Sequence, residues 1–270
     1  MIGEYAVPLS LTIIGDLLGV PKEARGKFRI WTEVLIDPRT DQVEQAKVAV
    51  VEMEKLFTGL IHAKRDDPAD DLISDIISEG RAAPHGAGVS EDELVSLFFL
   101  LFWAGYESSV HQIGNGILAL LDNPHQAESI RAGAGISGAA VEELLRYSHP
   151  SQFAIRRFAV EDLLIGGIRI PCGDTVLLGI ASANRDPDRY HNPEKLDLSR
   201  KGNPHLAFGH GIHYCLGASL ARIEVQVAVE SMLRYFPDLQ LAVPRSDLQW
   251  RASFRERGLR HLPVTLTPVC

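Results

Sequence analysis

The sequence predicts a mainly α-helical fold with a small β-rich part. Residues 90–122 contain no proline and are rich in apolar side chains, which is typical of one long helix. Several shorter stretches repeat apolar residues three and four positions apart, as amphipathic helices do. Two short apolar runs flank Gly166-Gly167, and this dipeptide favours a β-hairpin.

The first third of the chain is expected to be helical. Prolines, glycines and one charged cluster separate the expected helices, and we expect the charged cluster on the surface. In order, the expected elements are helices over Met1–Val20 and Lys22–Ile36, a turn at Asp37–Asp41, a helix over Val43–His62, a solvated connection at Lys64–Asp71, a short helix and a loop over Gly80–Gly88.

The long helix has a clear start. Ser90 followed by Glu93 forms a capping box, which satisfies backbone N–H groups at a helix N-terminus. About thirty residues of helix would extend roughly 45 Å. Its first half, Leu94–Trp103, is apolar nearly all round, so we expect it to run through the interior.

The rest of the chain mixes helices, short strands and an irregular segment that leads to His205. From Leu216 a helix is expected, with Leu216, Leu220, Ile223, Val227 and Leu233 on one apolar face. The other expected elements are a helix over Gly138–Tyr147, strands at Leu163–Ile165, Ile168–Ile170 and Thr175–Ile180, and short strands within Trp250–Leu266.

Composition excludes several classes of protein. A chain of 270 residues with 46% hydrophobic residues can bury a large core. Its formal net charge of −8 argues against nucleic-acid binding. The three cysteines, Cys172, Cys215 and Cys270, show no paired spacing, which fits a reducing cytoplasm rather than a disulfide framework.

No targeting or membrane segment is expected. Met1–Val20 has no basic leader and carries Glu4 and Asp16, unlike a signal peptide. The longest apolar run, Leu97–Gly105, is too short to span a bilayer.

Residues 205–217 form a glycine-rich loop that delivers Cys215 to the start of a helix. Unpaired N–H groups and the helix dipole at that point favour a thiolate, the form that binds metal. Phe208 is expected to shield the sulfur on one side. Three glycines allow positive φ angles or the close approach of a flat group: Gly209, Gly211 and Gly217. These features suit the axial ligand of a haem iron.

Two other interpretations of this loop compete. A single cysteine before a helix is often an inert core residue. A zinc site would need His205, His210, His213 and Cys215, but their spacing lacks the paired C-x-x-C or H-x-x-x-H steps of tetrahedral sites.

Small and polar residues interrupt the long helix at 104–109. A glycine inside a helix costs about 1 kcal/mol, and a buried carboxylate costs more. Gly105, Glu107 and Ser108 are therefore either functional or part of a helix-packing notch with a solvated Glu107.

The pattern Phe208-x-x-Gly211-x-His213-x-Cys215-x-Gly217 resembles the haem-binding signature of the cytochrome P-450 family, and the run on to Arg222 resembles its soluble bacterial branch. The resemblance covers nearly the whole chain. It implies that residues 1–270 are the C-terminal two-thirds of a cytochrome P-450 domain, with the distal helix at 90–122 and the cysteine loop at 205–217. It also implies a haem b cofactor with Cys215 as the axial thiolate to its iron.

The resemblance assigns further site residues. Ala104-Gly105-Tyr106-Glu107-Ser108 is similar to the family's A/G-G-x-D/E-T motif, with Ser108 in place of the usual threonine. Glu107 and Ser108 would manage protons, and Ala104 and Gly105 would leave room over the haem. Phe208, Gly209, Gly211 and Gly217 would shape the loop around it.

Arg157 and His213 would bind the haem propionates. Arg156 is adjacent to Arg157 and is easily confused with it, and a merely solvated Arg157 is the alternative.

Glu143 and Arg146 lie three residues apart on one helical face and can form an ion pair. By itself this is an ordinary surface pair. It also matches the family's E-x-x-R element, which implies a role in stabilising the fold. The family often adds an arginine from a P-E-R-F-like stretch, where this chain has Lys195.

The resemblance implies a monooxygenase that inserts one oxygen atom of O2 into an apolar small molecule. Electrons would come from NAD(P)H through a separate ferredoxin and ferredoxin reductase in the cytoplasm, with no nucleic-acid or membrane partner. The family's early helices have no counterpart here, so a truncated product or a fragment is expected. The alternative is a non-catalytic haem-binding remnant.

Overall fold

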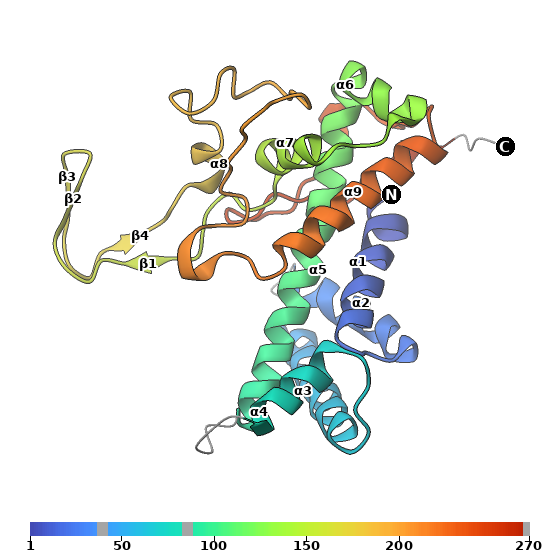
Figure 1. Cartoon of the computed structure of the whole chain (residues 1–270), viewed down its shortest axis with the longest axis vertical. Coiled ribbons are helices and arrows are strands. Elements are labelled where there is room, and N and C mark those ends of the chain that lie inside the picture. The colour runs from blue at the N-terminus through green and yellow to red at the C-terminus, as the bar shows by residue number, and fades with distance from the viewer. Residues whose placement is uncertain (37–42, 83–88, 267–270) are drawn as a thin grey trace. The chain divides into compact units, whose positions relative to one another are not determined.

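The computed structural model describes residues 1–36, 43–82 and 89–266 (Figure 1). The chain forms two compact units: Ile2–Val110, and Met1 together with His111–Cys270. The boundary falls within one long helix, α5 (Glu91–Leu121). The mainly helical fold with a few small sheets is confirmed. The expected turn at 37–41, most of the loop at 80–88 and Cys270 lie outside the described residues.

The regular elements of the unit Ile2–Val110 are all helices within its described residues. Besides the first part of α5, its elements are the π-helix η1 (Ile2–Ala6), α1 (Val7–Leu17), α2 (Lys22–Ile36), α3 (Val43–Asp66) and α4 (Leu72–Ala82). Three buried aromatic rings join α2, α3 and α5. The Phe28 ring centroid lies 4.3 Å from that of Phe102 and 5.7 Å from that of Phe57. Such tilted pairs add to the stabilisation from burial alone.

The start of α5 confirms the capping box. The Ser90 N–H donates to Glu93 Oε2 at 2.8 Å, and the Glu93 N–H donates to Ser90 Oγ at 3.3 Å. Burial follows one stripe of the helix, which includes Phe98 and Tyr106, while Leu100 is 61% exposed. The expected all-round burial of Leu94–Trp103 is therefore wrong. By length and composition alone α5 passes for a membrane span, as the core helices of water-soluble proteins also do.

The expected solvated connection at Lys64–Asp71 is also wrong in part. Helix α3 continues to Asp66, and Asp71 is buried. The Asp71 carboxylate pairs with Lys64 and accepts the Ser74 N–H at 2.9 Å. Burial opposes its ionisation, but these partners hold the pKa of Asp71 below its usual value. Gly19 lies against this carboxylate with φ +63°, and a Cβ there would lie 2.3 Å from Asp71 Oδ2.

The second unit combines helices with three small antiparallel sheets. After the second part of α5 its helices are α6 (Pro124–Ser129), η4 (Ile130–Ala134), α7 (Gly138–Ser148), α8 (Ile180–Ala183), η5 (Gly211–His213), α9 (Ala218–Tyr235) and η6 (Arg245–Asp247). The sheets pair β1 (Arg157–Phe158) with β4 (Thr175–Val176), β2 (Leu163–Ile165) with β3 (Ile168–Ile170), and β5 (Gln240–Leu241) with β6 (Val264–Thr265).

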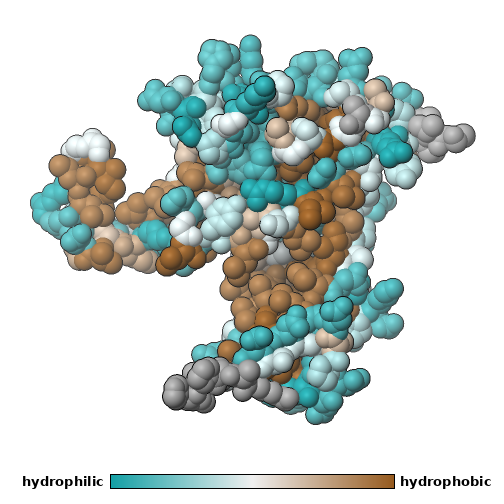
Figure 2. Space-filling view, in the orientation of Figure 1, coloured by the Kyte–Doolittle hydropathy of each residue, from teal (hydrophilic) through white to brown (hydrophobic). Residues whose placement is uncertain are grey.

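The hairpin β2–β3 turns at Gly166 and Gly167, whose φ angles are +56° and +79°, as expected. Apolar side chains remain exposed on this hairpin, and Figure 2 shows it as a projecting part with a largely hydrophobic surface. The strand expected over Thr175–Ile180 ends at Val176, because the pairing then shifts by one residue to a Phe153–Gly179 bridge and α8 begins at Ile180.

Helix α9 begins at Ala218 rather than Leu216, and its expected apolar face is largely wrong. Ile223 and Val227 are 59% and 54% exposed. The buried face instead includes Ala228 and Met232, and α9 packs against α7 and η4. Of the expected set, Leu233 is buried.

Replacing Asp71 with Asn should lower the free energy of unfolding by about 2 kcal/mol, because the half-buried Lys64 loses its charged hydrogen-bond partner. Urea unfolding at pH 7 measures the difference. The folded pKa of Asp71 is depressed, so its contribution is present above the ordinary value and is lost as pH falls through the folded value. The exposed neighbour provides the control variant Asp70→Asn. Equal stability of the two variants would contradict this account.

Candidate functional site

Glu143 and Arg146 form a fully buried ion pair on α7. Arg146 Nε donates to Glu143 Oε2 at 2.7 Å and Arg146 Nη2 donates to Glu143 Oε1 at 2.8 Å, and both side chains are 0% exposed. Arg146 Nη1 also donates to the carbonyl oxygens of Asn184 and Pro193, at 2.8 and 2.9 Å. The pair is therefore no ordinary surface ion pair. It ties α7 to the irregular segment that precedes the cysteine loop.

The third charged partner is Arg200, which sequence reasoning missed. Arg200 Nε donates to Glu143 Oε2 at 3.0 Å, and Asn203 Nδ2 donates to the same oxygen at 2.9 Å. Lys195, which stands where the family often has an arginine, contributes only its backbone carbonyl to Arg146. Arg200 is the next basic residue after Lys195 in this turn-rich segment, which is the signal that could have found it.

The cysteine loop is closed by its own backbone. The Cys215 N–H donates to Phe208 O at 2.9 Å, and the Gly209 N–H donates to Leu206 O at 2.9 Å. Gly209 and Gly211 adopt φ angles of +73° and +72°, as the sequence led us to expect. Gly217 has an ordinary φ of −83° and caps α9. The loop therefore presents Cys215 from a fixed turn, three residues before the helix.

The surroundings of the thiol are apolar and open. Cys215 is exposed, and its neighbours Ile212 and Leu216 are 98% and 91% exposed. The Phe208 ring faces the rings of His205 and Tyr214, with centroids 5.9 and 6.3 Å away. This half-buried ring supports the loop from its inner side.

The structure does not support the alternative of a zinc site at this loop. His205 Nε2 lies 3.0 Å from Glu142 Oε2, and His205 Nδ1 accepts the Ala207 N–H at 3.2 Å, so both ring nitrogens are used. Within residues 1–36, 43–82 and 89–266, no group of metal-binding side chains combines His205, His210, His213 and Cys215.

The two proposed propionate ligands lie in open positions. Arg157 is half-buried at the start of β1, and its Nη1 donates to Ile155 O at 3.0 Å. The neighbouring Arg156 is exposed. His213 ends the short helix η5 and is exposed.

The segment 104–108 belongs to the other unit. Ser108 Oγ donates to Ala104 O, one turn earlier on α5, at 3.2 Å. A Cβ at Gly105 would lie 2.6 Å from Ile14 Cδ1, so this glycine makes room for α1. The packing-notch interpretation therefore accounts for Gly105, whereas Ser108 keeps a hydroxyl that packing does not require.

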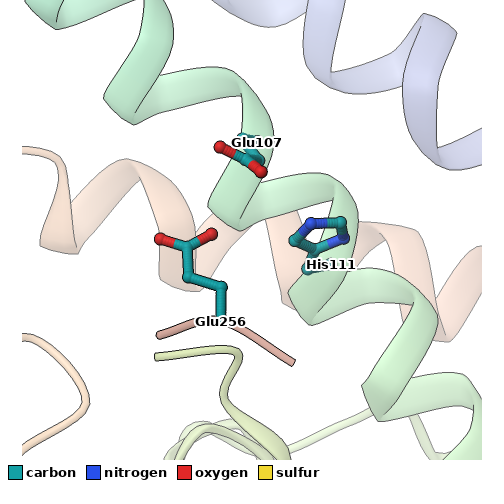
Figure 3. A group of neighbouring side chains, drawn as sticks. All are labelled: Glu107, His111 and Glu256. Atoms are coloured by element: carbon teal, nitrogen blue, oxygen red, sulfur yellow. The ribbon is translucent and has the colours of Figure 1, made fainter. Parts of the chain in front are cut away.

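His111 lies one helical turn after Glu107 on α5 (Figure 3). It is buried, and a Cβ at Gly258 would lie 2.3 Å from its ring, so the glycine permits this close packing. A ring nitrogen of His111 also lies within 4.8 Å of a Glu256 carboxylate oxygen. Sequence reasoning did not single out His111, although its spacing from Glu107 on an apolar helix was a usable signal.

A buried histidine, His149, closes α7. Burial, with the positive charge of Arg185 adding to it, lowers the pKa of His149 to about 3. His149 is therefore neutral at physiological pH and adds no positive charge at the end of α7.

A mainly helical chain that presents one exposed cysteine from a glycine-rich loop is compatible with thiolate ligation of a haem iron. The Cytochrome P450 family model matches residues 137–249. The polyketide biosynthesis cytochrome P450 PksS of Bacillus subtilis is 43% identical over 264 residues, which cover 98% of this chain and 64% of PksS. The cytochrome P450 monooxygenase PikC of Streptomyces venezuelae is 41% identical and is covered to 62%.

The solved structure of Bacillus subtilis PksS superposes with a TM-score of 0.91 at 42% sequence identity, covering 98% of this chain and 68% of that one. The chain belongs to the cytochrome P450 family. It spans about 64% of the length of the curated relatives it matches first.

Replacing Arg146 with Lys should leave little soluble protein, because an ammonium cannot reproduce the fork that binds Glu143 and two carbonyl groups. Removing one partner of a buried pair costs about 3–5 kcal/mol. Urea unfolding of the soluble fraction measures the loss. The control is Arg189→Lys, an exposed arginine of the same segment. A soluble Arg146→Lys protein as stable as the control would contradict a structural role.

Proposed function

We propose that this chain is the haem-binding part of a monooxygenase that inserts one oxygen atom of O2 into an apolar small molecule. The observation that carries the proposal is the cysteine loop. Its backbone hydrogen bonds hold an exposed thiol between two almost fully exposed apolar side chains, Ile212 and Leu216. Exposed apolar side chains next to a free thiol support the proposal that an apolar group binds at this loop.

Haem b fits this arrangement. Cys215 would hold the haem iron through its thiolate, and Gly209, Gly211 and Gly217 add no side chains of their own that would obstruct a flat group. Phe208 would support the loop, and His213 and Arg157 would bind the propionates. When bound, haem supplies the iron chemistry that activates O2, and thiolate ligation favours O–O cleavage.

The chain's own acid and hydroxyl would handle protons. Ser108 Oγ donates to Ala104 O, so its lone pairs can accept a proton while this bond holds the hydroxyl in place. Glu107 precedes it on α5 and would exchange protons with solvent. Serine keeps the hydroxyl found in the family's motif, but it lacks the methyl group that restricts threonine.

The remaining parts of the proposal concern partners. Electrons would come from NAD(P)H through a ferredoxin and its reductase in the cytoplasm. The name of PksS, a polyketide biosynthesis P450, supports a small molecule of the polyketide kind as the substrate, and the name of PikC supports monooxygenation as the reaction. The competing proposal, a haem-binding remnant without turnover, differs in one observable: haem binds but substrate is not oxidised.

Carbon monoxide difference spectra of the reduced, haem-loaded chain test the role of Cys215. The wild type should show the red-shifted Soret band of thiolate ligation, and Cys215→His should lose it because imidazole donates less electron density. The exposed cysteine of the hairpin region supplies the control, Cys172→Ser, which should keep the band. The same spectrum in wild type and Cys215→His would refute the assignment.

Ser108→Ala should raise the peroxide released per NAD(P)H oxidised several-fold. Without the hydroxyl, proton delivery is no longer directed, so more of the reduced oxygen should leave as hydrogen peroxide. Ser108→Thr should restore or improve coupling, since its branched Cβ leaves fewer rotamers. The assay combines the chain with a ferredoxin, its reductase and a turnover substrate. Ser96→Ala, an exposed serine of the same helix, is the control. An unchanged ratio in Ser108→Ala would show that the hydroxyl is idle.

A further inference from the structure

A second carboxylate on α7, Glu142, lies at the centre of a network beneath the cysteine loop. Its Oε1 accepts from Arg222 Nε at 2.6 Å, and its Oε2 accepts from Arg222 Nη2 at 3.1 Å. The same Oε2 lies 3.0 Å from His205 Nε2. One carboxylate on α7 therefore binds the first residue of the loop and a residue of α9, the helix that follows the loop.

Arg222 extends this network to two residues of the loop that precede the cysteine, Phe208 and Tyr214. Its guanidinium carbon lies 4.6 Å from the centroid of the Phe208 ring. Its Nη1 and Nη2 each lie 3.4 Å from the hydroxyl of Tyr214, the residue before Cys215. Phe208 is also the residue whose carbonyl accepts the Cys215 N–H. Arg222 thus contacts the two residues that fix the course of the backbone at the cysteine.

The charges in the network are defined by its geometry. His205 Nδ1 accepts the Ala207 N–H, so the proton of a neutral ring lies on Nε2 and is donated to Glu142. Burial lowers the pKa of His205 despite the nearby carboxylate, in agreement with a neutral ring. Although partial burial opposes it, hydrogen bonding to Arg222 keeps the pKa of Glu142 below its usual value. The network therefore contains one anion, Glu142, and one cation, Arg222.

Glu142 and Glu143 are adjacent, but their side chains point about 100° apart around the helix. Glu143 binds Arg146, Arg200 and Asn203, and so fixes the irregular segment before the loop. Glu142 binds the loop itself. Glu143 belongs to the E-x-x-R motif, whereas the motif assigns no role to Glu142.

We propose that Glu142, acting through Arg222 and His205, is a positioning residue that sets the shape of the cysteine loop and thereby the geometry of thiolate ligation by Cys215. The part about ligation rests on the proposed function. The part about loop shape concerns this chain alone and is testable without haem.

Hydrogen exchange of the full chain, read at the backbone amides of Gly209, Tyr214 and Cys215, measures the order of the loop. Glu142→Gln removes the charge that holds Arg222, so exchange at these amides should rise about tenfold, as for the loss of one charge-assisted contact. Tyr214→Phe removes a single acceptor and should give a smaller rise. Arg222→Lys keeps the charge but not the planar fork, so it should behave like Glu142→Gln.

Two controls separate local from global effects. Arg234→Met removes an exposed cation from the same helix, and Glu128→Gln removes an exposed carboxylate from α6; both should leave loop exchange unchanged. Amides within α7 and α9 should keep wild-type rates in Glu142→Gln. Unchanged loop exchange in a folded Glu142→Gln protein would overturn the proposal. If Glu142→Gln does not fold, Arg222→Lys decides in the same way, because it should raise loop exchange to a similar extent.

The second readout is spectroscopic. In haem-loaded protein, Glu142→Gln should lower the fraction with the thiolate Soret band severalfold at equal haem content, and the two controls should match the wild type. A wild-type fraction in Glu142→Gln would overturn the link from loop to ligand. If the wild type itself lacks this band while loop exchange rises as expected, the proposed function fails and the loop-positioning role stands.

Discussion

The buried ion pair between Glu143 and Arg146 is the constraint on which the rest of its unit depends. Two charges withdrawn from water cost more than their mutual attraction returns unless further hydrogen bonds satisfy them. Those bonds come from the segment that follows α8: the carbonyls of Asn184 and Pro193 bind Arg146, and Arg200 binds Glu143. Helix α7 and this irregular segment are therefore stable only together. A segment with almost no regular structure acquires one defined path.

That path leads to the cysteine. The segment fixed by Glu143 runs up to Asn203, and the loop that Glu142 contacts begins at His205. Two neighbouring carboxylates on one helix thus hold successive parts of the chain, and α9 is held by the same helix through Arg222. The position of Cys215 follows from polar contacts made several residues away. Exposed apolar neighbours can then remain at the thiol, because burial of these side chains is not what holds the loop.

Much of the fold could be predicted from local signals. The capping box at Ser90, the helix over Lys22–Ile36 and the Gly166-Gly167 hairpin depend on residues close together in sequence, and all three are observed. The cysteine loop could be predicted from local sequence as well, because Gly209 and Gly211 are the residue type that favours the positive φ angles observed there.

The features that could not be predicted depend on contacts between residues that are far apart in the sequence. The burial of Asp71 depends on Gly19, and the glycine at 105 is explained by Ile14. Arg200 pairs with Glu143, 57 residues away. The buried face of α9 was misjudged because apolar spacing shows that a helix has a face but not which side chains meet α7. Glu142 escaped notice because its neighbour carries the recognisable motif.

The most direct test of the account is the reactivity of cysteines toward a thiol reagent, mapped by mass spectrometry with and without one equivalent of haem. Cys215 and Cys172 are both exposed, so both should react in the haem-free chain. Haem should protect Cys215 at least tenfold and leave Cys172 unchanged, because only Cys215 lies in a loop built to present a ligand. Equal reactivity of the two cysteines in the presence of haem would contradict the central claim that this loop is a thiolate site for haem.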